Sequence, residues 1–216
     1  MYKTVVFDLD GTLLNTLEDL TDAVIYIQKK FDFPLHNIEL VRQHVGNGIR
    51  KLIIRSIPDG EDNPRFEEVY QEFLDYYQKN CQVKTRAYDG IMELLKELHE
   101  SNIKMAIVSN KAHGAVDELN EIYFKDYIKV AIGENEAAGI KKKPAPDSVF
   151  HALKLLGSKK EEAVYVGDSE VDRATAENAG MDCVLCSWGF RERELLEGLK
   201  PIAIIDEPKD LLKIIK

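Results

Sequence analysis

The sequence predicts an α/β fold in three layers: a parallel sheet covered by helices on both faces, with a helical domain inserted after the first strand. A short apolar run rich in β-branched residues, Thr4–Leu9, lies near the N-terminus. From about Leu17 to Asn80 the apolar residues recur only at helical spacing. After Asp89-Gly90 strand-like and helix-like segments alternate, which is typical of a parallel sheet with helices on both faces.

The inserted block reads as three helices. The run Thr4–Leu9, rich in β-branched residues, is expected to form a first, buried strand. Pro34 and Pro58-Asp59-Gly60 then divide the helical stretch. The expected helices are Leu17–Phe31, Ile38–Ile57 and Arg65–Asn80. We expect residues 15–86 to form an inserted domain, and residues 1–14 and 87–216 to form the core.

The second part of the chain supplies the rest of the expected sheet. The expected strands are Lys104–Val108, Ile128–Ile132, Ala163–Val166, Cys183–Cys186 and Ile202–Ile205. The expected helices are Ile91–Glu100, Gly114–Ile122, Asp147–Leu156, Val171–Ala179 and Pro208–Ile215. Ligands of open parallel sheets bind beyond the carboxyl ends of the strands, so the residues there are the first candidates for a site.

Composition narrows the function. The 216 residues carry a formal charge of −9, and Lys141–Lys143 is the only basic run, which argues against a nucleic-acid partner. No apolar run approaches the roughly 20 residues that cross a bilayer, so we expect no membrane partner. The chain starts directly with a strand, so we expect no signal peptide and a cytoplasmic location. Cys183 and Cys186 lie in an apolar stretch, where a core role is the better interpretation than a redox or metal pair.

Two carboxylates end the first strand. Side chains alternate along a strand, so Asp8 and Asp10 project to the same side. They would repel each other unless a cation lies between them or one of them carries a proton. Gly11 lets the backbone turn and present N–H groups to an anion. The alternative is a strand-to-helix turn capped by Asp10 or Thr12.

Polar residues also follow the next strand and a later loop. The Ser109 hydroxyl and the backbone N–H groups near Asn110 could donate to a phosphate oxygen, although a helix N-cap is the simpler role for either residue alone. In the loop, Pro144 holds Lys143 in an extended backbone. A fixed ammonium is what a phosphoryl group beside a carboxylate nucleophile needs.

Two further carboxylates follow the strand Ala163–Val166. Asp168 falls at the sheet edge, and Asp172 lies one helical turn later. Together with Asp8 they form an oxygen-rich set suited to a hard divalent cation. The alternative is a capping box of Ser169 with Asp172, and both interpretations can hold together.

The set Asp8–Thr12, Ser109–Lys111, Lys143-Pro144 and Gly167–Asp172 resembles the haloacid dehalogenase-like phosphatases, and within them the phosphoglycolate phosphatase type. The resemblance covers essentially the whole chain. It implies a Rossmann-like core, Mg²⁺ as cofactor and an aspartyl-phosphate intermediate, with the helical insert in the place of the family's mobile cap.

The resemblance also implies a role for each matching residue. Asp8 is the nucleophile, and Asp10 is the general acid and then the base. The expected phosphate-binding residues are Gly11, Thr12, Ser109, Asn110 and Lys143. The expected Mg²⁺ ligands are the Asp8 carboxylate, the Asp10 backbone carbonyl and Asp168, with Asp172 assisting. The expected substrate-facing cap residues are Asn47, Gly48 and Arg50.

The predicted activity is hydrolysis of a small soluble phosphomonoester by a monomer or homodimer. A sugar phosphomutase or a pyrophosphatase of the same superfamily is the alternative. Accumulation of free phosphate distinguishes the phosphatase from the mutase. A signalling receiver domain resembles the chain only loosely, because it has no helical insert and its accepting Asp follows a later strand.

Overall fold

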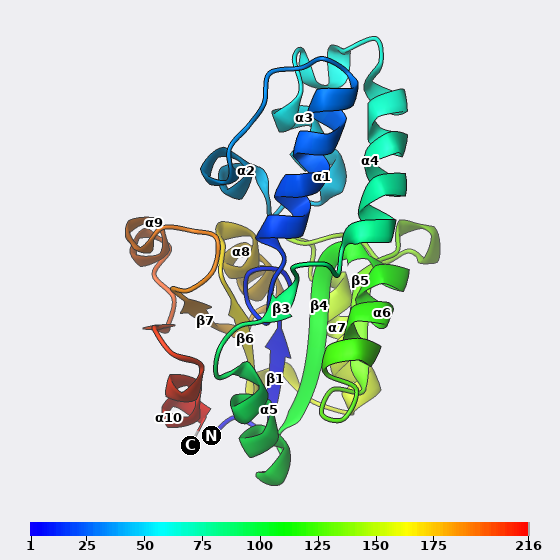
Figure 1. Cartoon of the computed structure of the whole chain (residues 1–216). Coiled ribbons are helices and arrows are strands. Elements are labelled where there is room, and N and C mark those ends of the chain that lie inside the picture. Colours follow the sequence, from blue (N-terminus) through cyan, green and yellow to red (C-terminus); the bar gives the residue numbers. More distant parts are fainter. Residues whose placement is uncertain (216) are drawn as a thin grey trace. The chain divides into compact units, whose positions relative to one another are not determined.

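The computed structural model describes residues 1–215, and the chain forms two compact units. Unit 1 comprises Met1–Leu13 and Ala87–Lys216, and unit 2 comprises Leu14–Arg86. Figure 1 labels their helices and strands. The chain leaves and re-enters unit 1 through two short paired strands, β2 (Leu14–Asn15) and β3 (Arg86–Ala87).

Unit 1 is built on a six-stranded sheet in the order β5-β4-β1-β6-β7-β8. Its strands are β1 (Thr4–Phe7), β4 (Lys104–Ala112), β5 (Val130–Glu134), β6 (Ala163–Gly167), β7 (Asp182–Cys186) and β8 (Ala203–Ile205). All neighbouring pairs are parallel. Phe7 is in register with Ile107 of β4 and Val166 of β6, so β1 is central. The predicted parallel α/β fold is confirmed.

Helices cover both faces of this sheet. They are α5 (Ile91–Glu100), α6 (His113–Tyr123), α7 (Asp147–Leu156), α8 (Glu170–Ala179), α9 (Arg193–Gly198) and α10 (Leu211–Ile215). On one face Val6 and Tyr165 form a core with residues of α7, α8 and α9. In Figure 1 α5 lies in front of the strands, and α7 and α8 lie behind them. The helix α6 connects β4 to the neighbouring strand β5, and α7 connects β5 to β6 on the other side of β4 and β1.

Several boundaries in unit 1 differ from the expected ones. β4 continues to Ala112, four residues past its expected end, with a register shift against β5 between Val108 and Ala112. β5 begins at Val130 because the buried residue Ile128 instead belongs to a turn, in which its N–H donates to Phe124 O. The helix α9 was not expected, since six residues with one buried leucine carry little periodic signal.

Unit 2 is helical, with α1 (Leu17–Lys30), α2 (Ile38–His44), α3 (Ile49–Ser56) and α4 (Phe66–Asn80). Its core includes Val24, Ile53 and Phe73, which are fully buried. The expected single helix Ile38–Ile57 is wrong. Gly46 and Gly48 have φ angles of 113° and 83° in the segment that separates α2 from α3, and this left-handed region interrupts a helix.

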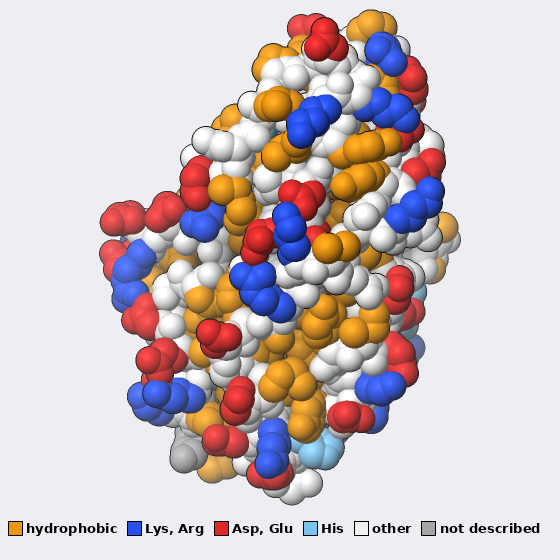
Figure 2. Space-filling model, in the orientation of Figure 1, with side chains coloured by type: hydrophobic (Ala, Val, Ile, Leu, Met, Phe, Trp, Pro, Cys, Tyr) orange, Lys and Arg blue, Asp and Glu red, His pale blue; other side chains and the backbone are white. Residues whose placement is uncertain are grey.

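Short 3₁₀ segments complete the described chain. They are η1 (Gly60–Asp62), η2 (Glu136–Ala138), η3 (Lys160–Glu162) and η4 (Pro208–Asp210). Within residues 1–215 no helix combines the length and the apolar character that crossing a membrane demands. Figure 2 shows acidic and basic side chains interspersed over the face in view, without a continuous basic stripe.

Candidate active site

Asp8 follows the central strand β1 directly, at its carboxyl end. Its N–H donates to Val166 O of β6 at 2.8 Å, which fixes the backbone at the point where the strand pairing ends. The residue is 6% exposed, so the carboxylate is nearly buried. Its Oδ1 lies 2.5 Å from Lys143 Nζ, and its Oδ2 is engaged by no hydrogen bond or ion pair within residues 1–215. One carboxylate oxygen is therefore held while the other stays available.

Lys143 is held at both its backbone and its ammonium. Its N–H donates to Asn110 Oδ1 at 2.7 Å, and Asn110 Nδ2 donates to Lys143 O at 3.1 Å. Besides Asp8, the ammonium donates to Asp172 Oδ1 at 2.8 Å and contacts Tyr165 OH at 3.1 Å. The side chain of Asn110, a predicted phosphate-binding residue, therefore holds the backbone of the loop that carries Lys143.

Asp168 lies just before the helix α8 and Asp172 lies in its first turn, both close to Asp8. The Ser169 hydroxyl donates to Asp172 Oδ2 at 2.5 Å, and Asp172 N donates back to Ser169 Oγ at 3.4 Å, so the capping interpretation holds. Asp168 N also donates to Asp172 Oδ2. Asp168 Oδ2 accepts from Phe190 N at 2.6 Å, whereas Asp168 Oδ1 has no such partner in residues 1–215. Both oxygens of Asp172 are thus satisfied by the protein, and Asp168 keeps one oxygen free.

The charges of this cluster shift one another's pKa values. Burial, followed by the charge of Asp172, raises the pKa of Asp8 to about 7 despite the opposing effect of Lys143. Burial, followed by Asp172 and Asp8, raises the pKa of Asp168 well above its usual value. Burial disfavours the Lys143 ammonium, yet Asp172 and Asp8 outweigh it and raise its pKa. Burial acts to raise the pKa of Asp172, but Lys143 and the hydrogen bonds from Ser169 and Tyr165 together outweigh burial and lower this pKa.

The cluster fits a divalent cation. Asp8, Asp168 and Asp172 each offer one carboxylate oxygen, and these three oxygens lie within 4.8 Å of one another. Three buried carboxylates face one buried ammonium, so negative charge is in excess where water cannot screen it. Carboxylate oxygens are the ligands that Mg²⁺ prefers. The free oxygens of Asp8 and Asp168 are the donors best suited to hold such an ion, while Asp172 orients its neighbours.

Gly11 and Thr12 form the turn after Asp10. Gly11 has a φ of 93°, and a Cβ there would collide with the Asp168 carboxylate and the Phe190 ring, so only glycine fits. The Thr12 side chain is buried, and its carbonyl accepts from Trp188 Nε1 at 3.0 Å. The turn is therefore locked against the segment that follows β7.

Asp10 faces a second buried lysine. Lys111 Nζ lies 3.0 Å from Asp10 Oδ1, and the two side chains are 5% and 17% exposed. The nearby Ser109 Oγ accepts from Lys111 N at 3.1 Å. Sequence reasoning included Lys111 in the Ser109–Lys111 motif but gave it no role of its own.

Tyr165 is the other residue that sequence reasoning missed. In the sequence it reads as one apolar position of a buried strand, and its ring does lie in the core. Only the fold shows that its hydroxyl meets Lys143 and Asp172.

The predicted cap residues lie in unit 2. Gly48 precedes α3 as its N-cap residue, and Asn47 is half-buried beside it. The Arg50 guanidinium forms ion pairs with Glu61 at 3.0 Å and Glu67 at 2.8 Å. It also stacks over Phe66, 4.5 Å from the ring centroid. Substrate contact by these three residues stays a prediction.

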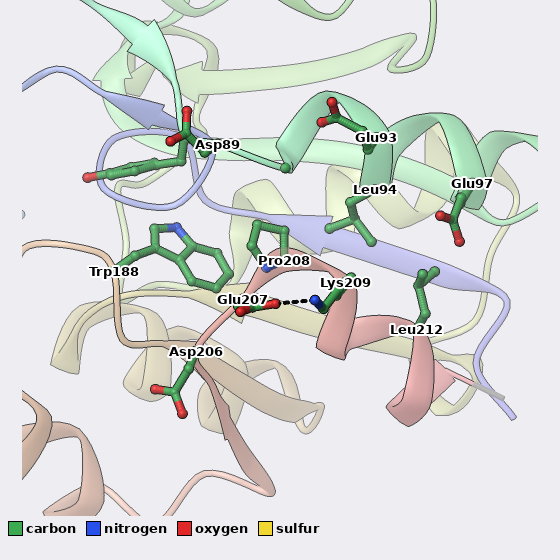
Figure 3. A pocket seen from close by; sticks show the side chains of 12 residues that line it. Asp89, Glu93, Leu94, Glu97, Trp188, Asp206, Glu207, Pro208, Lys209 and Leu212 are labelled. Carbon is green, nitrogen blue, oxygen red and sulfur yellow. Dashed lines mark ion pairs between the residues drawn. The ribbon is translucent and has the colours of Figure 1, made fainter.

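A separate groove of about 660 Å³ lies elsewhere on unit 1 (Figure 3). Trp188, Pro208 and Leu212 line it, and Asp8, Lys143 and Asp168 do not. Trp188 therefore contacts the turn after Asp10 through its indole N–H and lines this groove.

Sequence comparison places the chain among known proteins. A family model described as haloacid dehalogenase-like hydrolase matches residues 5–186. A phosphoglycolate phosphatase of Pseudomonas aeruginosa is 32% identical over 215 residues, which cover 97% of this chain and 78% of that protein. A phosphoglycolate phosphatase of Aquifex aeolicus is 29% identical over 213 residues, covering 98% and 96% of the two chains.

Solved structures agree. A crystal structure from Lactobacillus delbrueckii subsp. bulgaricus matches with a TM-score of 0.93 and 33% identity, over 99% of this chain and 98% of that one. A predicted phosphoglycolate phosphatase from Haemophilus somnus matches with a TM-score of 0.90 and 26% identity, over 100% and 98%. The resemblance predicted from the motifs is confirmed: the chain belongs to the haloacid dehalogenase-like hydrolases.

Proposed function

We propose that this hydrolase is an Mg²⁺-dependent phosphatase that removes phosphate from a small, phosphoglycolate-like monoester through an aspartyl-phosphate on Asp8. The observation that carries the proposal is the Asp8 carboxylate, with one oxygen held 2.5 Å from the buried Lys143 ammonium and the other not engaged by the described protein. The relatives from Pseudomonas aeruginosa and Aquifex aeolicus, named as phosphoglycolate phosphatases, support the substrate class.

The first half-reaction transfers the phosphoryl group to the enzyme. The free oxygen of Asp8 attacks phosphorus, a bond forms between them, and the bond from phosphorus to the substrate alcohol oxygen breaks. The protonated Asp10 carboxyl gives its proton to the departing alcohol. Lys143 and Ser109 hold the transferring group, because a carboxylate that approaches a phosphate dianion needs positive charge and hydrogen-bond donors around it.

The second half-reaction regenerates the enzyme. The ionised Asp10 takes a proton from water as the water oxygen attacks phosphorus. The bond from phosphorus to Asp8 breaks, inorganic phosphate leaves, and both carboxyl groups return to their starting states. The ion pair of Asp10 with Lys111 holds the carboxylate in place for this step.

A divalent cation fits beside this carboxylate. Asp8 and Asp168 would hold Mg²⁺, with the Asp10 backbone carbonyl as the predicted third ligand and Asp172 assisting by orienting its neighbours. When bound, the ion supplies charge neutralisation between the carboxylate and the phosphoryl oxygens. The excess of buried carboxylates over ammonium groups supports this assignment.

The test is release of inorganic phosphate from a panel of phosphate esters that includes 2-phosphoglycolate, hexose phosphates and pyrophosphate, with and without Mg²⁺. We expect turnover of small monoesters that depends on Mg²⁺, and the fastest turnover with 2-phosphoglycolate. Interconversion of hexose phosphates without net release of phosphate, or preferential cleavage of pyrophosphate, would contradict the proposal.

A further inference from the structure

The Tyr165 side chain lies beneath the catalytic cluster and is completely buried. Its ring packs in the hydrophobic core with Val6 and Val108. Its hydroxyl lies 3.0 Å from Asp172 Oδ1 and 3.1 Å from Lys143 Nζ. The phenol thus joins an apolar core to the charged groups of the site.

The chemistry of the two partners fixes the direction of both hydrogen bonds. An ionised Asp172 can only accept, so the Tyr165 hydroxyl donates to it. The Lys143 ammonium can only donate, so the hydroxyl oxygen accepts from it. Burial raises the pKa of Tyr165 well above its usual value, so the phenol keeps the proton that it donates. A phenylalanine would fill the core equally well, hence the hydroxyl serves the site above it.

The Lys143 ammonium has more acceptors than protons. Four acceptors lie within 3.3 Å of its Nζ, whereas an ammonium carries three N–H groups. They are Asp8 Oδ1, Asp172 Oδ1, Tyr165 OH and Val108 O. Asp8 and Asp172 therefore compete for one cation. The hydrogen bond that Tyr165 donates to Asp172 Oδ1 supplies this oxygen with a second donor and weakens its attraction for the Lys143 ammonium.

We propose that Tyr165 is a positioning residue, whose hydroxyl restrains the Lys143–Asp172 pair so that the ammonium stays directed at Asp8 and at the phosphoryl group. This inference rests on the proposed roles of Asp8 and Lys143. Without the hydroxyl, Asp172 draws the ammonium toward itself and away from the nucleophile. The ring and the core stay as they are.

The test compares Tyr165→Phe with Tyr2→Phe, using p-nitrophenyl phosphate and Mg²⁺. Tyr2 is a matched control, because its hydroxyl also donates to a carboxylate, Asp182 at 2.6 Å, on the exposed surface. We expect Tyr165→Phe to lower kcat about tenfold, as the loss of one hydrogen bond to a charged group would. Its midpoint of thermal unfolding should stay within a few degrees of that of Tyr2→Phe, which keeps wild-type kcat.

One further readout separates positioning from a structural role. In the background of Asp172→Asn, adding Tyr165→Phe should change kcat less than twofold, since the competition is already gone. A wild-type kcat, additive effects or a failure to fold would each overturn the inference.

Asp8→Asn, measured beside these variants, separates this inference from the proposed function. If Asp8→Asn is inactive while Tyr165→Phe behaves as wild type, only the role of Tyr165 fails. If Asp8→Asn retains full activity, the proposed covalent mechanism fails, and the role of Tyr165 fails with it.

Discussion

Replacing Lys143 by methionine removes an ammonium that contacts both Asp8 and Asp172. The Lys143 side chain is 3% exposed, and its Nζ lies 2.5 Å from Asp8 Oδ1 and 2.8 Å from Asp172 Oδ1. Methionine fills most of the same volume, so the change is chiefly one of charge. It leaves two buried carboxylates without their cation.

The cost of this substitution follows from burial and from the pKa of Asp8. Removing one partner of a buried pair costs about 3–5 kcal/mol in the free energy of unfolding. Because the pKa of Asp8 is already raised to about 7, this carboxyl takes up a proton easily, and we expect the lower end of that range at pH 6. For a chain of this size a loss of about 3 kcal/mol lowers the unfolding midpoint by about 6–12 °C.

The assay is thermal unfolding of metal-free Lys143→Met at pH 6 and pH 8, together with turnover of 2-phosphoglycolate. The decrease in the free energy of unfolding should be larger at pH 8, where the Asp8 carboxyl ionises without a cation beside it. Turnover should fall about 10²–10³-fold, as when a preorganised donor is removed from other active sites. Lys141→Met, which changes an exposed lysine of the same loop, is the control and should match the wild type. Wild-type turnover by Lys143→Met would refute the placement of the phosphoryl group.

Three more predictions follow from the site. Gly11→Ala should abolish turnover and lower the unfolding midpoint, because a φ of 93° and the Asp168 carboxylate exclude a Cβ. The control is Gly114→Ala in α6, where a Cβ meets nothing within 4 Å, so this variant should be active and slightly more stable than the wild type. Equal behaviour of the two variants in turnover and calorimetry would contradict this prediction. Because the pKa of Asp8 is raised to about 7, its ionisation destabilises the metal-free fold. The stabilisation that the protonated Asp8 carboxyl gives is present near pH 4 and is lost as the pH rises through about 7. The unfolding free energy of Asp8→Asn, measured in urea relative to the wild type, should therefore increase over that interval, and a decrease would contradict the prediction. Removal of divalent ions should stop turnover. Added Mg²⁺ should raise the unfolding midpoint of the wild type but not that of Asp168→Asn. An equal rise in both proteins would exclude Asp168 as a ligand.

The sequence predicted those parts of the structure that depend on local patterns. Alternating apolar strands and helices in residues 91–215 determined the parallel sheet, and strand ends determined where the carboxylates and Lys143 would gather. The predictions from the sequence were wrong where a helical pattern was very short or where the backbone conformation of glycine residues interrupted it. α9 has only six residues, and a backbone with positive φ at Gly46 and Gly48 interrupts an otherwise helical apolar spacing.

Contacts across the fold were beyond prediction for a different reason. The Tyr165 hydroxyl meets Lys143 because β6 brings residue 165 beneath a loop that is 22 residues away in the chain. Asn110 binds the backbone of Lys143 across 33 residues. No local spacing encodes such pairs, since they depend on how the loops pack over the sheet.

The most direct measurement of the central claim is trapping of the phosphorylated enzyme. The wild type is quenched in acid during turnover of 2-phosphoglycolate, reduced with borohydride, digested and analysed by mass spectrometry. We predict that the modification falls on the peptide that contains Asp8, and that Asp8→Asn is folded, inactive and unmodified. Modification of another residue, or steady turnover by Asp8→Asn, would contradict covalent catalysis at this carboxylate.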